Sequence, residues 1–227
     1  MSEAPREAAA VSNAIRARRP PGGALLDLHA HGWERSLDSG ASTAALVLRA
    51  AACGLDGVCL TDHNAVCAPG EAAALAEQHG VAVIPGMEVG TDIGHVLVFG
   101  LDRFRPELVH IRQLRRIALA EGAAMVWAHP MRELNLPRPD WAELPALFEA
   151  LEVVNGDHND REDGYFAQLA QALGLGCTAG SDAHSVQAIG RVATAFEAPV
   201  RDLNALIAAL RVRAHAAVDL RRAPAAG

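Results

Sequence analysis

ALLDLHAHGWERSLDSG, residues 24–40, and GLDGVCLTDHN, residues 54–64, decide the fold class of this chain. Each stretch contains a short apolar run, at 24–29 and 56–61, that predicts a strand. Between the two runs, an amphipathic stretch begins after Ser42, a residue suited to a helix N-cap, and ends at Gly54, a residue suited to a C-cap. A strand, a helix and a second strand in this order predict a parallel βαβ unit.

The same alternation continues through the rest of the chain. Apolar runs predict further strands at 81–86, 95–100, 123–129, 151–155, 176–181 and 191–196. Amphipathic stretches predict helices at 70–79, 106–121, 140–150, 163–173 and 201–213. Seven or eight strands exceed most small open sheets, so we expect an α/β fold with a closed or nearly closed barrel, and a doubly wound open sheet is the alternative. We expect a flexible N-terminal arm at 1–23, one barrel domain at 24–220 and a tail at 221–227.

Composition excludes several classes of protein. All 20 basic residues are Arg, so a Schiff-base lysine and a P-loop lysine are ruled out. The net charge of −7 argues against a broad nucleic-acid surface. The four cysteines have no CxxC spacing, and neither a bilayer-spanning apolar run nor a secretory signal is evident, so we expect a cytoplasmic protein that does not associate with membranes.

Histidines and acids gather at the ends of the predicted strands. In DLHAH, His29 and His31 are two residues apart, so on an extended strand both imidazoles point the same way and could bind one metal. Glu88 follows an apolar strand, where a carboxylate must be exposed, paired or coordinated. Five strand ends deliver such groups to one rim, which predicts a metal site. Histidines and carboxylates without cysteine favour Zn, Mn or Fe.

The order HAH, SLDSG, TDH, GMEV, GHV, AHP and GSDAH resembles the PHP (polymerase and histidinol phosphatase) family of metal-dependent phosphoesterases from about Leu26 to His184. The resemblance implies a distorted (β/α)7 TIM-like barrel with up to three metal ions at the C-terminal rim of the strands. It assigns His29, His31, Glu88 and Asp182 to a first ion, Glu88, His95 and His129 to a second, and Asp38, His63 and His184 to a third.

The expected function is metal-dependent hydrolysis of a phosphate ester, and the favoured substrate is a small phosphomonoester. The site is expected to hold two to three divalent ions, with a hydroxide that bridges two of them as the nucleophile. Glu88, Asp182, His129 and Arg191 are the expected catalytic residues. Arg191, and also Arg35 and Arg132 in the rim loops, could bind phosphate. Asp27 and Asp62 could orient the histidines beside them. Asn155 is expected to shape a loop, and His158 to be solvated.

Three alternatives stay open. The first is a metal-dependent exonuclease or phosphodiesterase, which the acidic charge disfavours because no extended nucleic acid is expected to bind. The second is a metal-binding regulatory module without turnover. The third is an amidohydrolase, for which a metal-bridging lysine is expected in many members, and this chain has none.

Overall fold

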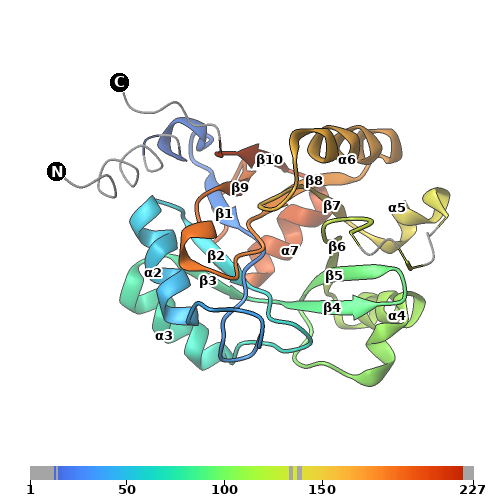
Figure 1. The fold of residues 1–227 in the computed structure, drawn as a ribbon, viewed down its shortest axis with the longest axis horizontal. Coiled ribbons are helices and arrows are strands. Elements are labelled where there is room, and N and C mark those ends of the chain that lie inside the picture. The colour runs from blue at the N-terminus through green and yellow to red at the C-terminus, as the bar shows by residue number, and fades with distance from the viewer. Residues whose placement is uncertain (1–12, 14, 133–134, 137–139, 222–227) are drawn as a thin grey trace.

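The computed structural model describes residues 13, 15–132, 135–136 and 140–221. Their strands form two five-stranded sheets, in the orders β10-β9-β1-β2-β3 and β4-β5-β6-β7-β8 (Figure 1). The first sheet comprises β1 (Ala24–Asp27), β2 (Gly57–Leu60), β3 (Ala82–Pro85), β9 (Val192–Phe196) and β10 (His215–Asp219). The second comprises β4 (Met87–Thr91), β5 (Gly94–Phe99), β6 (Ala124–Trp127), β7 (Ala150–Asn155) and β8 (Gly176–Gly180).

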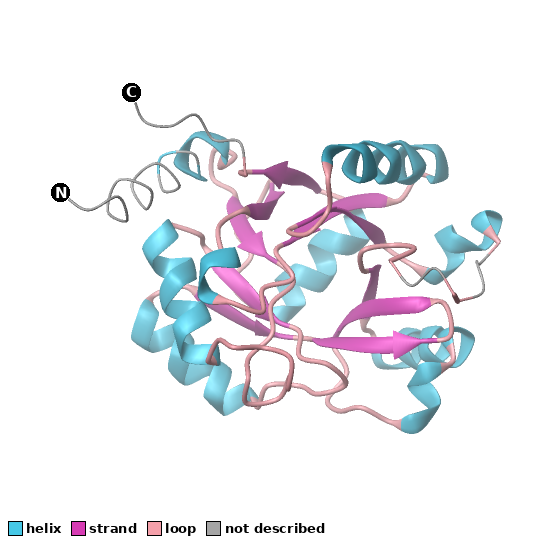
Figure 2. Ribbon diagram, in the orientation of Figure 1, coloured by secondary structure: helices cyan, strands magenta, loops and turns pink. Residues whose placement is uncertain are grey.

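Helices surround the two sheets (Figure 2). They are α2 (Thr43–Cys53), α3 (Pro69–His79), α4 (Ile111–Glu121), α5 (Leu144–Leu147), α6 (Asp160–Leu173) and α7 (Leu203–Val212), with 3-10 turns η1 (Pro106–Val109), η2 (Trp141–Glu143) and η3 (Val186–Ala188). The caps expected from sequence are present: the Ser42 side chain accepts from the amide of Ala45, and Gly54 ends α2 at φ 89°. None of these helices is long and apolar enough to span a bilayer.

The expected closed or nearly closed barrel is not confirmed, because the described strands form two separate sheets. The parallel pattern also fails in places, since β4, β5 and β6 pair antiparallel, as do β1, β9 and β10. Only Asp92 and Ile93 separate β4 from β5, and so short a connection permits an antiparallel hairpin but no helical crossover. The sequence analysis missed β4 and β10 as strands.

The two sheets meet at two seams close to the histidine-bearing loops. At one seam His63 bridges to Glu88, and the Glu88 amide donates to the carbonyl of Asp62 over 3.1 Å. At the other, Ala30 bridges to Ala183, and the His31 amide donates to the Ala183 carbonyl over 3.0 Å. Residues far apart in the chain are thereby brought to one end of the strands.

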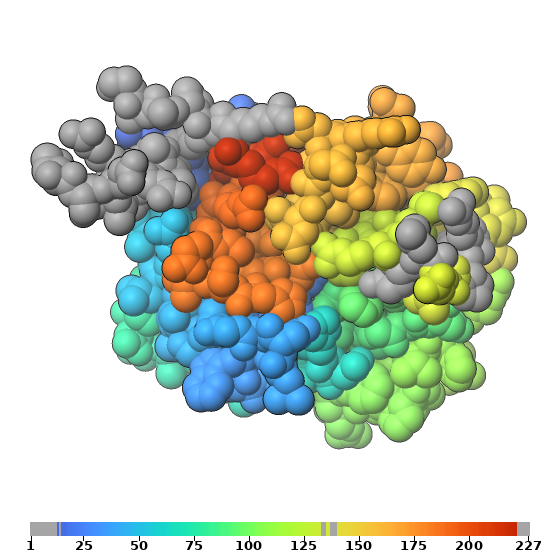
Figure 3. Space-filling view, in the orientation of Figure 1, coloured from blue at the N-terminus to red at the C-terminus, as the bar shows by residue number. Residues whose placement is uncertain are grey.

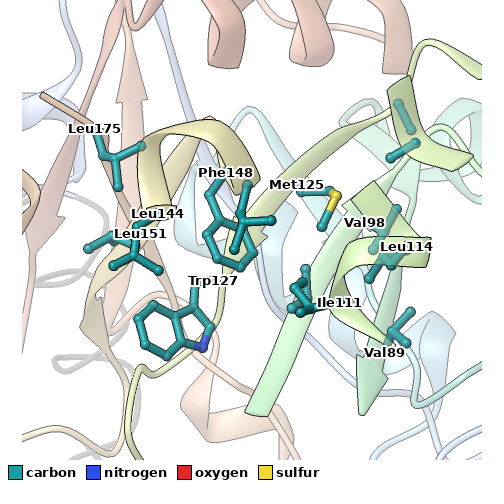
Figure 4. Close-up of a cluster of buried hydrophobic side chains, with 14 of the residues drawn as sticks. Val89, Val98, Ile111, Leu114, Met125, Trp127, Leu144, Phe148, Leu151 and Leu175 are labelled. Carbon is teal, nitrogen blue, oxygen red and sulfur yellow. The ribbon is translucent and has the colours of Figure 1, made fainter. Parts of the chain in front are cut away.

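Buried apolar side chains fill the interior and the outer faces of the sheets. Leu26 of β1 and Leu97 of β5 share one cluster with Leu206 of α7, so the two sheets enclose a common core. A second cluster lies between the sheet β4–β8 and its helices, with Trp127 and Phe148 at its centre (Figure 4). Strands that are apolar on both faces produce the uninterrupted apolar runs of the sequence.

The predicted arm at 1–23 and tail at 221–227 lie partly outside the described residues. Within the described part, Ile15 is fully buried, and the Arg19 guanidinium donates to the carbonyl of Gly54 over 2.7 Å. Arg221 donates to the carbonyl of His158 over 2.6 Å. Both segments therefore contact the domain where the structure describes them.

Candidate metal centre

Glu88 of β4 is the centre of a cluster of buried and half-buried polar side chains. Its side chain is fully buried, and each carboxylate oxygen faces a different group of imidazoles. Oε1 lies 2.9 Å from His95 Nδ1, 3.0 Å from His129 Nε2 and 3.4 Å from His29 Nε2. Oε2 lies 2.9 Å from His63 Nδ1 and 3.3 Å from His31 Nε2. This arrangement suits a carboxylate that bridges two ions.

Asp182, in the loop after β8, faces the same cluster from the opposite sheet seam. Its Oδ1 lies 3.2 Å from His31 Nε2, 3.4 Å from His29 Nε2 and 3.6 Å from His184 Nδ1. Asp38, in the loop after β1, completes the outer side: its Oδ2 lies 3.0 Å from His63 Nε2 and 3.3 Å from His184 Nε2. The Asp38 side chain is 55% exposed, whereas that of Asp182 is 2% exposed.

All nine residues expected to bind metal are therefore in one place, and we name them the nine-residue cluster. His95 joins although it begins its strand, because β5 runs antiparallel to β6 and its first residues lie at the end where β6 finishes. The space-filling view shows a narrow depression where the blue loop after β1, the orange loop after β8 and the yellow-green loop after β6 meet (Figure 3).

The cluster contains four triads whose ligand atoms lie within 4.8 Å of one another. They are His29–His31–Asp182, His29–Glu88–His129, His63–Glu88–His95 and His31–His63–His184. The first triad lies within the expected first site, whereas each of the other three combines residues that the resemblance assigns to different ions. His29, His31, His63 and Glu88 each belong to two triads, so the division of ligands among individual ions stays a prediction.

The donor atoms fit divalent ions. The Nε2 atoms of His29 and His31 are buried and have no hydrogen-bond partner within the described residues. Their other ring nitrogens are occupied, since His29 Nδ1 lies 3.0 Å from Glu152 Oε1 and His31 Nδ1 lies 3.3 Å from Ser36 Oγ. A buried polar atom without a partner is costly, and a metal ion at the centre would satisfy both Nε2 atoms.

Carboxylates and imidazoles favour each other's charged forms at the centre of the cluster. Burial raises the pKa of Glu88, but the surrounding histidines, His29 foremost, outweigh burial and hold the pKa well below its usual value. Burial also raises the pKa of Asp182, but the effects of His29 and His31 are larger, so the pKa of Asp182 is lowered. Burial lowers the pKa of His29, yet the charges of Asp182, Glu152 and Glu88 raise it well above its usual value. A cation is therefore favoured at this position.

Glu152 of β7 is a buried acid that the sequence analysis did not single out. It accepts from His29 Nδ1, from the His129 amide over 2.8 Å and from Asn155 Nδ2 over 2.9 Å. A Cβ added at Gly180 would overlap both His29 and Glu152, so β8 must approach this pair without a side chain. Its signal in the sequence is one acid inside the apolar run LEVVN. Glu152 orients His29 so that Nε2 faces the centre.

Two cluster residues have strained backbones. His129 has φ 24° and Asp182 has φ 53°, both in the left-handed region that L-residues rarely adopt. Such conformations cost about 1–3 kcal/mol each and concentrate at functional sites. These backbone conformations turn the chain sharply after β6 and β8, where the two side chains enter the cluster.

Asp62 organises the loop after β1. Its carboxylate accepts from the Gly32 amide over 2.7 Å, from Ser36 Oγ over 3.0 Å and from Arg35 Nε over 2.8 Å. Arg35 also pairs with Glu71 of α3 over 3.0 Å, so its guanidinium already has two acidic partners. Asp27, beside the cluster, accepts from the Ser181 amide over 2.8 Å, and burial raises its pKa to about 6.

The arginines differ in their relation to the cluster. Arg132 Nη1 donates to Asp182 Oδ2 over 2.6 Å, and its Nη2 donates to Asn155 Oδ1 over 2.9 Å. Arg191 is exposed just before β9, and its catalytic role stays a prediction. His158 corrects an expectation, because its side chain is 6% exposed rather than solvated. His158 packs against Phe166 at a ring distance of 5.4 Å.

Known proteins share both the sequence pattern and the fold. Ribonuclease P protein component 3 from Natronomonas pharaonis is 32% identical over 110 residues, which cover 47% of this chain and 44% of that protein, so the match spans less than half the length of this relative. The solved structure of PsfC from Pseudomonas syringae has a TM-score of 0.68 at 23% identity and covers 90% of this chain and 94% of its own.

A two-domain Bacteroides vulgatus protein that contains a predicted PHP-like metal-dependent phosphoesterase has a TM-score of 0.62 at 21% identity, over 88% of this chain and 66% of its own. At these identities the two structures show the fold alone. A model of the PHP-associated region matches residues 165–214, and a model of the PHP domain matches residues 27–180. Because the second match spans more than half of the 227 residues, the chain belongs to the PHP family.

Proposed function

We propose that this protein hydrolyses small phosphate monoesters, and that its cofactors are two to three divalent ions of Zn, Mn or Fe held by the nine-residue cluster. The observation that carries this proposal is the meeting of five imidazoles around the two oxygens of the buried Glu88 carboxylate. Residues 24–220 are proposed to form the single domain that performs the reaction.

Charge supports the choice of a phosphate substrate. Three divalent ions would carry a charge of about +6 against the carboxylates of Asp38, Glu88 and Asp182, which leaves a positive pocket in a protein of net charge −7. Ions bound there would generate a nucleophile from water at neutral pH and neutralise charge on the phosphoryl oxygens. Hydrolysis joins a water oxygen to phosphorus and breaks the ester P–O bond, so that the alcohol leaves with a proton and inorganic phosphate remains.

The chain's own residues have three roles in this proposal. Glu88, Asp182 and His129 hold the ions, and their burial excludes bulk water from the ligand atoms. Glu152 fixes the orientation of His29, and Ser36 fixes that of His31. Arg132, whose guanidinium donates to Asp182, is the first candidate to bind a phosphate oxygen, and Arg191 is the second.

A second candidate function is a nuclease. The ribonuclease P component 3 relative favours it, since that protein belongs by name to an enzyme that acts on RNA. Against it stands the net charge of −7, because binding a long polyanion depends on many Lys or Arg contacts to phosphate. A terminal monoester also offers three oxygens to the ions, whereas a diester offers two. We therefore place the monoester first.

The test is a comparison of substrates under one metal condition. Protein stripped with a chelator is reloaded with Mn, Zn or Fe, and the bound metal is measured. Phosphate release is followed for sugar phosphates, nucleotides and histidinol phosphate, release of the coloured alcohol for a chromogenic diester, and release of nucleotides for single-stranded oligonucleotides. We expect kcat/KM at least ~10-fold higher for a small monoester than for oligonucleotides, a preference of about 1.4 kcal/mol. Oligonucleotide cleavage that outpaces every monoester would replace this proposal with the nuclease.

A further inference from the structure

A groove of about 370 Å³ opens beside the nine-residue cluster. Its walls include Met131, Arg132, His158, Tyr165 and Phe166. One wall is the segment that directly follows His129, and the other is the segment that follows Asn155 together with the first turns of α6. None of these wall residues belongs to the nine-residue cluster, and apart from Arg132 none has a role in the proposed reaction.

Arg132 connects the groove to the cluster. It lines the groove, while its Nη1 lies 2.6 Å from Asp182 and its Nη2 lies 2.9 Å from Asn155. A phosphate bound at the ions within reach of Arg132 therefore has the groove as a neighbour. The part of the substrate that extends from the phosphate past Arg132 enters the groove, and in a monoester that part is the leaving group.

The groove walls are aromatic and apolar. Tyr165 lines the groove, is 51% exposed and contacts Phe166 edge to face at a ring distance of 5.3 Å, so aromatic surface is available to a ligand there. Met131 adds a thioether, and its backbone at φ 66° is in the left-handed region. Flat rings bind such surfaces by stacking and by contact with sulfur.

The far wall is held in place by partly buried contacts of Arg221. Arg221 donates to the carbonyls of Asn155 and His158 over 3.1 and 2.6 Å, and it also pairs with Asp163. His158 Nδ1 lies 3.3 Å from Asp163 Oδ1, which fixes the ring against Phe166. A wall held by these contacts is preorganised for a ligand, and preorganisation favours affinity.

Charge at the groove selects against anionic groups. Asp157 and Glu162 both line it, and Asp157 is exposed. Arg132 is the only basic guanidinium among the described lining residues, and it already faces Asp182 and Asn155. A leaving group with a second negative charge would be repelled by the two carboxylates.

We propose that this groove binds the leaving group of the substrate and that the preferred substrate is a phosphomonoester of an alcohol with an uncharged or cationic aromatic ring. The inference rests on the proposed phosphoesterase function and adds to it the class of leaving group. Tyr165 is the specificity-determining residue, because it supplies the exposed aromatic surface.

The test measures binding separately from turnover. Benzylphosphonate and ethylphosphonate differ by the ring and cannot be hydrolysed as esters, so calorimetry with the metal-loaded protein reports recognition of the ring alone. We expect benzylphosphonate to bind about 10-fold more tightly to the wild-type protein. Tyr165→Ala removes most of this difference, Tyr165→Phe retains it, and Leu48→Ala, which truncates an exposed apolar side chain on α2, leaves it unchanged.

Kinetics with benzyl phosphate and ethyl phosphate give the matched second readout, since their alcohols are of similar acidity. Tyr165→Ala is expected to lower kcat/KM for benzyl phosphate about 10-fold and to leave ethyl phosphate unchanged. Equal affinity of the two phosphonates for the wild-type protein, or an equal loss of both in Tyr165→Ala, overturns the groove assignment. Selective phosphonate binding without hydrolysis of either ester overturns the phosphoesterase proposal and retains the groove.

Discussion

Trp127 and His129 lie two residues apart at the end of β6, and both side chains are 1% exposed. Trp127 stacks on Phe148 at a ring distance of 5.9 Å within the apolar cluster of Figure 4. His129 instead faces the Glu88 carboxylate at 3.0 Å. Burial of Trp127 removes apolar surface from water and is favourable in itself, whereas burial of His129 requires charged and polar partners. The end of β6 therefore supports stability, and the turn that follows it supplies a residue of the metal centre.

The largest effect is expected from Glu88→Gln. The amide keeps the volume of the side chain but removes the charge that faces five imidazoles, so kcat/KM should fall by more than ~100-fold and bound metal should decrease. Metal analysis and phosphate-release kinetics check this result. Glu77→Gln, at an exposed site on α3, is the matched control. Equal losses in both variants would show that the centre is misplaced.

Trp127→Ala tests the other side of the comparison. Truncation of a buried indole is expected to lower the free energy of unfolding by about 3–5 kcal/mol and Tm by roughly 10 °C. Calorimetric unfolding measures both quantities. The folded fraction should still bind metal at the wild-type ratio, because Trp127 packs in the apolar cluster. Loss of metal at an unchanged Tm would contradict the separation of core and centre.

Glu152→Gln lies between these extremes, because Glu152 is as buried as Trp127 and acts through His29. Loss of the carboxylate that accepts from His29 Nδ1 is expected to weaken metal affinity ~10–100-fold. Metal titration at fixed pH measures the change, and Glu152→Asp tests whether a shorter carboxylate restores part of it. Wild-type metal affinity in Glu152→Gln would leave Glu152 without a role at the centre.

The local sequence predicted the positions of the strands better than the way in which the strands pair. The eight expected strands correspond to observed strands because each is a short apolar run with its own turn residues. β4 was missed because Glu88 and Gly90 interrupt its apolar pattern, and β10 because its residues HAAVD are mostly half-buried. The barrel is not confirmed, because pairing between strands depends on connections such as the short β4–β5 turn, which strand patterns do not report.

The centre was predictable where ligands repeat at short spacing and less so where partners are distant. His29 and His31 are evident from an i, i+2 pair at a strand end. Glu152 was missed because its partner His29 is 123 residues away. Contacts of this length follow from the fold and not from the local sequence. The burial of His158 was missed for another reason, because its partners Asp163 and Phe166 are close in the chain and meet the ring only through the turn into α6.

The smallest effects are expected from the two arginines proposed to contact phosphate, and they separate a residue bonded to the centre from one exposed beside it. Arg132→Ala should raise KM for a small monoester about 10-fold, because Arg132 is bonded to Asp182 and can turn a charge-assisted donor toward phosphate. Arg132→Lys retains the charge but loses the paired donors, so it should recover part of the loss. Arg191→Ala should change KM by less than about threefold, because its side chain is exposed just before β9.

Steady-state kinetics of the three variants at one metal concentration, with bound metal measured in each, decide the assignment. A larger effect of Arg191→Ala than of Arg132→Ala would transfer the phosphate contact to Arg191 and would require the loop before β9 to reach the centre when substrate binds.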